Sequence, residues 1–193
     1  MPALLPLLAL VSTVYKVEID NAWVRVIREI VPPHQTSEVH SHPATVVVWL
    51  TDGPRRKAGD VVYNEPGATV IDNRSDREVD AITIELKTGA PPSTPITLDP
   101  VKLDPAHHIV VLENSRVRAI RTILEPGLKS PLHEHPHYVV VYLTELHTTM
   151  ELGDGRVVDN PRQPGEVAWR DYMKHSTLNV GRKTAVEIQV ELK

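Results

Sequence analysis

The chain contains no cysteine and no phenylalanine, and aromatic residues make up only 4% of its 193 residues. Without cysteine, disulfide frameworks, thiolate zinc sites, iron–sulfur clusters and cysteine nucleophiles are all excluded. Any bound metal must therefore be held by nitrogen and oxygen ligands. Excess positive charge is also missing. The formal net charge of −4 gives no support for a nucleic-acid or anionic-membrane partner.

Long apolar runs are absent too. The apolar stretch from Ala3 to Val11 resembles the core of a signal peptide, but it is too short to span a membrane and proline interrupts it. No lysine or arginine precedes this stretch. We therefore expect a cytoplasmic protein, with export as the less favoured alternative. The stretch would then form a strand laid on the neighbouring domain or on a partner subunit.

What the chain does contain is a repeat. Segment 38–43 (EVHSHP) returns at 131–136 (PLHEHP), and each copy is followed by a valine run. The copies are 93 residues apart up to the valine run and 106 apart after it, so the second copy carries 13 additional residues. A repeat of this kind predicts two similar structural units. We expect domains at 1–88 and 105–193, joined by a proline-rich linker at 89–104.

The strand pattern agrees with this division. The 17 prolines, 9 glycines and recurrent valine runs favour short strands joined by tight turns. Strands are predicted at 14–19, 23–31, 45–51, 60–63, 69–72 and 79–87, and again at 109–113, 117–124, 138–144, 166–170, 176–180 and 184–192. A hairpin found only in the second copy is predicted at 147–159, around an Asp-Gly turn. The chain is therefore expected to be all-β. Domains this small should pack against each other or dimerise, and a homodimer is expected.

The second copy contains three histidines that are candidate metal ligands. In a strand, His133 and His135 would point to the same face, so both could bind one ion. A third histidine, His175, lies later in the second copy, four positions before Asn179. Neutral imidazole binds zinc, iron, copper, nickel and manganese. This spacing predicts a metal site.

These residues resemble the motifs of the cupin superfamily. Gly127, His133 and His135 match its first motif (Gly, five residues, His-x-His), and His175 with Asn179 matches the end of its second. The resemblance covers nearly the whole chain, once per copy. The chain thus resembles a two-domain bicupin, similar to small metal-dependent cupin dioxygenase-like proteins.

The chain departs from the family pattern in two places. Val139 and Val140 stand where the family places its glutamate, and segment 170–174 lacks the usual Pro-x-Gly. The resemblance implies two tandem cupin-type double-stranded β-helix (jelly-roll) barrels. It also implies one divalent metal ion (Fe, Mn, Zn, Ni or Cu) held by three histidines without a carboxylate. Three neutral ligands leave the charge of the ion uncompensated, so we expect a small anionic substrate.

The first copy keeps His40 and His42, but Thr69 stands in the position of His175. His34, which takes the place of Gly127, is an alternative third ligand, so whether these histidines bind a second metal is left open. The short connection at 51–54 removes the hairpin that would wall a deep pocket. We expect the first domain to be structural, with a degenerate metal site.

Further candidates lie in the second copy. Glu145 and His147 open the additional hairpin and are candidates for a substitute ligand or an acid–base pair, against solvated strand ends. Tyr142 and Trp169 are candidate substrate-pocket residues, against a core role. His137 is either a fourth ligand or lies at the pocket mouth.

Two more groups are expected to be structural. The pair 107–108 is interpreted as a turn and capping element. Arg118 and Arg121, which have counterparts in the first copy, are expected to form structural salt bridges.

The leading hypothesis is a metal-dependent enzyme, an oxygenase or another enzyme of enolate-type chemistry. One alternative is a non-catalytic module that binds or senses a small molecule or a metal. A second is an isomerase, cyclase or lyase, for which a His/Asp or Tyr/His acid–base pair would be expected in place of three ligands.

Overall fold

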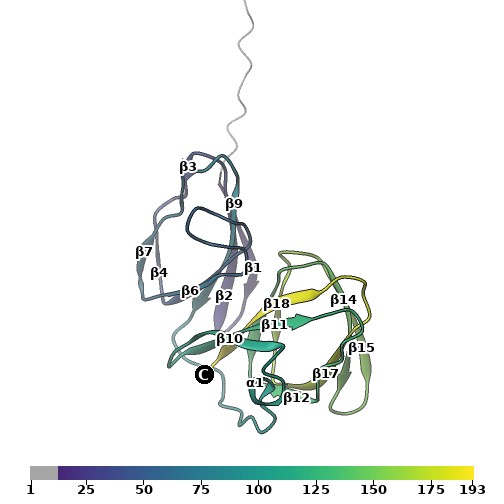
Figure 1. Ribbon diagram of the computed structural model, residues 1–193. Coiled ribbons are helices and arrows are strands. Elements are labelled where there is room, and N and C mark those ends of the chain that lie inside the picture. The colour runs from purple at the N-terminus through teal and green to yellow at the C-terminus, as the bar shows by residue number, and fades with distance from the viewer. Residues whose placement is uncertain (1–12) are drawn as a thin grey trace, which may run out of the picture.

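The fold is all-β apart from one short helix, within the residues that the computed structural model describes, 13–193 (Figure 1). The stretch 3–11, for which a strand is predicted, lies outside the described residues. The first half of the chain contributes nine strands: β1 (Val14–Asp20), β2 (Val24–Val31), β3 (Gln35–Thr36), β4 (His40–His42), β5 (Thr45–Trp49), β6 (Val61–Asn64), β7 (Gly67–Thr69), β8 (Asp72–Asn73) and β9 (Val79–Leu86).

The second half begins with the single-turn helix and adds nine strands. These elements are α1 (Pro100–Leu103), β10 (His108–Glu113), β11 (Val117–Leu124), β12 (His133–His135), β13 (Tyr138–Tyr142), β14 (Leu146–Leu152), β15 (Val157–Arg162), β16 (Val167–Arg170), β17 (Met173–Asn179) and β18 (Ala185–Leu192). The hairpin predicted from the Asp-Gly turn is confirmed as β14–β15. Among the described residues, no helix is long and apolar enough to cross a membrane.

The sheet topology repeats between the halves. Each half has a five-stranded sheet, in the order β1-β2-β9-β5-β6 in the first and β10-β11-β18-β13-β16 in the second. The register repeats as well. Val24 faces Leu86 across β2 and β9, and Val117 faces Leu192 across β11 and β18, which are shifts of 93 and 106 residues. The two offsets read from the sequence therefore hold at the level of strand pairing.

The second layer differs between the halves. In the second half it is one four-stranded sheet, β12-β17-β14-β15. In the first half it consists of two separate two-stranded ladders, β3–β8 and β4–β7. Because the first copy lacks the β14–β15 hairpin, its two ladders have no strand that joins them.

The two five-stranded sheets pack against each other. Alternate residues of a strand point to opposite faces, and one face of each sheet enters a single apolar cluster. In β2 this face carries Val24 and Val26, and in β11 it carries Val117 and Ala119. The cluster combines buried valine, isoleucine, leucine and alanine side chains of both halves. The two halves of the chain therefore share one apolar core.

Polar contacts across this interface are arranged symmetrically. Arg121 of the second half donates from Nη2 to the carbonyl oxygen of Gly59, at 2.7 Å. Arg28, the repeat partner of Arg121, lies against Gly165, the repeat partner of Gly59. The two halves thus contact each other through equivalent surfaces, as subunits do around a two-fold axis. The salt bridge predicted for Arg121 is not among these contacts, because the guanidinium reaches a backbone carbonyl and no carboxylate.

Candidate metal centre

Strand pairing brings the three predicted histidines together. His133 and His135 lie on one face of β12, and His133 is directly opposite His175 in the antiparallel ladder with β17. The ring centroids of His133 and His135 are 4.9 Å apart, those of His133 and His175 are 4.5 Å apart, and those of His135 and His175 are 5.5 Å apart. All three side chains are buried. They offer ligand nitrogens that lie within 4.8 Å of one another.

Each of the three rings keeps a buried nitrogen without a hydrogen-bond partner in the described part of the chain. His133 donates from Nδ1 to the carbonyl oxygen of Pro131, and His135 donates from Nδ1 to Oε1 of Glu191, both at 2.7 Å. Nε2 of both histidines and Nδ1 of His175 are buried with no hydrogen-bond partner within residues 13–193. Burial lowers the pKa of all three imidazoles, so they are neutral at pH 7 and carry lone pairs. Three convergent, unpartnered imidazole nitrogens are the donor set that a divalent transition metal requires.

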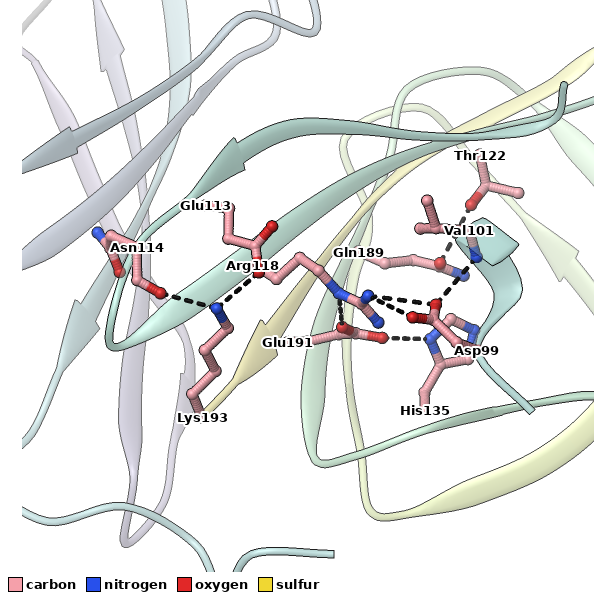
Figure 2. Close-up of polar contacts among 10 residues, drawn as sticks. All are labelled: Asp99, Val101, Glu113, Asn114, Arg118, Thr122, His135, Gln189, Glu191 and Lys193. Atoms are coloured by element: carbon pink, nitrogen blue, oxygen red, sulfur yellow. Dashed lines mark hydrogen bonds and ion pairs between the residues drawn. The ribbon is translucent and has the colours of Figure 1, made fainter. Parts of the chain in front are cut away.

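An ion-pair network orients His135 from outside the centre. Figure 2 shows Arg118 between two carboxylates, with Nε donating to Oε2 of Glu191 at 2.6 Å and Nη1 lying 3.0 Å from Oδ2 of Asp99. Glu191 is 2% exposed, and its other oxygen holds His135. A carboxylate that fixes the tautomer and orientation of a ligating histidine is typical of metal sites. The salt bridge predicted for Arg118 is thus confirmed.

The segment that precedes α1 is held by hydrogen bonds to β12, the strand that carries His133 and His135. Oε2 of Glu134 accepts hydrogen bonds from the backbone N–H groups of Thr97 and Leu98, at 2.8 and 3.1 Å. These bonds lower the pKa of Glu134 to about 2. Asp99 then caps α1 by accepting from the N–H of Val101. The middle residue of the His-x-His motif therefore faces away from the two histidines and binds the segment that carries Asp99.

A cavity of about 20 Å³ adjoins the centre. Its polar lining includes residues that sequence reasoning missed, foremost His108 and Glu187. The ring of His108 is 1% exposed and lies 5.0 Å from that of His133, between centroids. Burial lowers the pKa of His108 to about 4 and raises that of Glu187 to about 7.

Hydrogen bonds connect Glu187 to its neighbours in this lining. Gln189 donates from Nε2 to Oε1 of Glu187 at 2.8 Å, and its own Oε1 accepts from the hydroxyl of Thr122 at 3.0 Å. The repeat contained a signal for Glu187, because its counterpart in the first copy is Ala81. His107 does have the expected turn contact, with Nδ1 2.7 Å from Oδ1 of Asp104. His108 has this turn contact as well, with Nδ1 3.3 Å from the carbonyl oxygen of Asp104, and it also lines the cavity.

The structure does not bring Glu145 and His147 to the histidines. Along β14, Leu146 and Thr148 are buried while His147 is exposed, because neighbouring residues of a strand alternate between faces. Outside the barrel, Glu145 pairs with Lys183 at 2.6 Å and His147 pairs with Asp159 at 2.7 Å. Neither side chain lines the cavity beside the histidines.

The aromatic candidates and His137 also lie away from the cavity lining. Tyr142 is 2% exposed and belongs to an apolar cluster inside the second half. Trp169 packs against the cluster between the halves and stacks on His137, with ring centroids 5.9 Å apart. His137 in turn contacts Asp171. The two valines at the glutamate position diverge, because Val139 joins the cluster between the halves and only Val140 faces the inside of its own half.

In the first half, the ladder pairs His40 with Thr69, so the position of His175 is indeed taken by threonine. His34 has a φ of 57°, the left-handed conformation that its repeat partner Gly127 also adopts. Its side chain is exposed and lies 2.9 Å from Asp76. His34 therefore occupies a turn position, and the described residues include no second convergent set of three ligands.

No protein-family model matches the chain, and no curated protein matches it either. Solved structures do. AerE from Microcystis aeruginosa superposes with a TM-score of 0.67 at 13% identity, over 94% of this chain and 98% of AerE. A variant of salicylate 1,2-dioxygenase from Pseudoaminobacter salicylatoxidans, in complex with gentisate, gives a TM-score of 0.61 at 9% identity, over 88% of this chain and 68% of that one.

A variant of oxalate decarboxylase from Bacillus subtilis gives a TM-score of 0.61 at 13% identity, with the same two coverages of 88% and 68%. The chain has the cupin fold. In this cupin fold, the His-x-His strand β12 and the strand β17 opposite it hold the three histidines. At these identities, the likeness establishes the fold and leaves the chemistry to the residues of the site.

Proposed function

We propose that this protein is a metal-dependent cupin enzyme that acts on a small anionic metabolite by oxygenase or other enolate-type chemistry. One divalent ion per chain would be held by His133, His135 and His175. The observation that carries the proposal is the convergence of three buried imidazoles whose free nitrogens have no partner within the described residues. Three neutral ligands do not offset the charge of the ion, which favours an anionic chelating ligand.

A bound ion would supply Lewis-acid polarisation of a substrate oxygen and charge stabilisation. The chain itself supplies a proton-transfer group beside the centre. Glu187 lines the cavity, and because its pKa is about 7, the carboxyl both holds and releases a proton near neutral pH. Gln189 donates to Oε1 of Glu187 and so leaves Oε2 as the oxygen that carries the proton.

The size of the cavity favours a second candidate, a non-catalytic module that binds or senses a metal. A volume of about 20 Å³ holds roughly one water molecule. A substrate larger than this needs the lining side chains to move. A sensing module needs only the ion. Binding of the ion to His135 would then alter the hydrogen bonds among Glu191, Arg118 and Asp99.

We further propose that each half is a cupin-type jelly-roll barrel, with domains at 1–88 and 105–193 and a linker at 89–104. The matching sheet order and pairing register of the two halves support this division. The homodimer and the cytoplasmic location expected from the sequence stay predictions.

Elemental analysis of untagged protein, followed by dioxygen uptake with a panel of enolisable acids and diketones, tests the function. The enzyme proposal expects about one transition-metal ion per chain and substrate-dependent dioxygen consumption that His175→Ala abolishes. An ion without turnover, with anions that bind at the centre, would favour the sensing module. A protein that retains no transition metal would contradict both.

A further inference from the structure

A cavity of about 170 Å³ lies in the first half, against about 20 Å³ beside the three histidines in the second. The sequence predicts the opposite, because the first copy lacks the hairpin expected to wall a pocket. The structural reason is that the separate ladders β3–β8 and β4–β7 cover this cavity less completely than the four-stranded sheet covers the other. The cavity opens to solvent at Thr69 and Val70, which are exposed.

A buried carboxylate with no lysine or arginine beside it lines this cavity. Glu29 is only 3% exposed, and no lysine or arginine is among the lining residues. Its polar neighbours are the hydroxyl of Thr83, which donates to Oε1 at 3.2 Å, and Nε2 of His40, at 4.0 Å. A buried carboxylate is costly unless it is paired. In the second copy this position is Thr122, so the carboxylate is particular to the first half.

A hydrogen-bond acceptor without a partner lines the same cavity. His42 is 7% exposed and its Nδ1 donates to the carbonyl oxygen of Pro43 at 2.6 Å. In the neutral ring Nε2 is then the acceptor, and this buried atom has no partner within residues 13–193. The cavity thus offers a carboxylate and an imidazole acceptor, while Val47, Val62 and Ile71 give it an apolar wall.

These groups do not match a metal ion. Among the described residues, His133, His135 and His175 are the set of three whose ligand atoms lie within 4.8 Å of one another. Glu29, His40 and His42 are spread more widely, around a space that holds about five or six water-sized groups. Separated acceptors with an apolar wall fit a small organic ligand that brings its own donors and a positive charge.

We propose that the cavity of the first half binds a small organic cation, an ammonium group carried on a short apolar body. The ammonium pairs with the carboxylate of Glu29 and uses a second of its three donors on an acceptor of the His40–His42 strand. The apolar body lies against Val47, Val62 and Ile71. This site is separate from the three-histidine centre and does not depend on the function proposed for that centre.

Three probes of one length test the charge requirement in the natural chain: n-butylammonium, n-butanol and butyrate. Each is titrated into the full protein as purified, with binding followed by calorimetry and by backbone amide shifts in NMR spectra. We expect n-butylammonium to bind one per chain and to shift signals of β2, β4, β5 and β9. Butanol and butyrate should bind at least about tenfold more weakly, because a charge-assisted hydrogen bond is lost.

Two glutamate variants then test whether Glu29 binds the ammonium group. Glu29→Gln keeps the shape of the side chain and removes its charge, so it should weaken n-butylammonium binding about tenfold or more. Glu78→Gln changes an exposed carboxylate of the same half that does not line the cavity, and should leave binding unchanged. His175→Ala, in the other half, should also leave it unchanged.

Equal binding of n-butylammonium and n-butanol would overturn the proposal, as would shifts confined to the second half. A zinc ion that binds in the first half and competes with n-butylammonium would show a metal site instead. If Glu29→Gln does not fold, as judged by the dispersion of its NMR spectrum, Thr83→Val replaces it and should weaken binding by loss of the hydroxyl that orients Glu29. The comparison of the three probes in the natural chain stands without either variant.

Discussion

At the scale of single residues, Glu191 decides which nitrogen His135 presents to the centre. We predict that Glu191→Gln lowers metal affinity about 10–100-fold, because the anionic acceptor that fixes the ring is lost. Competition with a chromophoric chelator measures this. Glu85→Gln is the matched control, since Glu85 is the repeat partner of Glu191 in the half that lacks the three-histidine set. Equal losses of affinity in both variants would show a general effect on folding instead.

His175 is predicted to be required for the metal and dispensable for the fold. His175→Ala should release the ion while the protein unfolds cooperatively as before, because Thr69 occupies the same ladder position in the first half. Metal content and a thermal melt of the metal-free proteins check both parts. His137→Ala, a histidine stacked on Trp169 away from the cavity, should keep the ion. Unchanged metal content in His175→Ala would refute the ligand assignment.

Glu187 is predicted to make stability depend on pH near neutrality. Its pKa is about 7 in the folded protein against an ordinary value of 4.5, so the folded state retains the proton that the unfolded state gives up. Its contribution is fully present below pH 4.5 and is lost as the pH rises through 7. Relative to Glu187→Gln, the metal-free natural chain should lose about 3 kcal/mol of unfolding free energy across this window. Urea denaturation at several pH values measures this, and parallel curves for the two proteins would disprove it.

The candidate site was predictable from the sequence only in part, and individual residues show why. His133 and His135 were found because their His-x-His spacing repeats, and His175 was found because, with Asn179, it matches the end of the second motif of the cupin superfamily. His108 and Glu187 were missed because the alternation of a strand gives two faces, and only packing decides which face is inside. The same ambiguity misplaced Glu145 and His147, which lie on the outer face of the hairpin strand or next to it. Glu191 has a counterpart in Glu85, so comparison of the copies could not mark it.

At the scale of elements, the segment before α1 is predicted to depend on Glu134. Its carboxylate accepts from the N–H groups of Thr97 and Leu98, so Glu134→Gln should speed hydrogen exchange at these two amides roughly tenfold. Exchange at core amides of β11 should not change. Glu151→Gln, an exposed carboxylate of the same half, is the control. Unchanged exchange at Thr97 and Leu98 would show that Asp99 and Arg118 hold the segment alone.

Most strands were predictable, and the exceptions depend on pairing with strands elsewhere in the chain. The alternation in β2 and β11 and the Asp-Gly turn of β14–β15 are signals within the sequence itself. Strand β17 begins at Met173, three residues before its predicted start, because pairing with β12 extends it. The open cavity of the first half was not foreseen, since the gap between two ladders depends on strands that are far apart in the sequence.

At the scale of the whole molecule, a side chain at Gly59 is predicted to weaken the interface between the halves. A Cβ there would lie 2.9 Å from Cδ1 of Leu143, and the residue has a φ of +87°. Gly155 has a φ of +84° with nothing within 4 Å, so Gly155→Ala isolates the backbone strain. Gly59→Ala should be less stable than Gly155→Ala by about 1 kcal/mol or more, from crowding at the interface. Equal thermal denaturation midpoints for the two variants would contradict this.

The reciprocal contacts of Arg121 with Gly59 and of Arg28 with Gly165 have a consequence for how the two halves came to differ. Two separate copies joined in this way would separate on dilution, and every substitution would alter both partners at once. Within one chain the association is intramolecular and independent of protein concentration. Each half is also encoded separately. One half can therefore exchange a histidine for Thr69 and acquire Glu29, while the other keeps its three histidines intact.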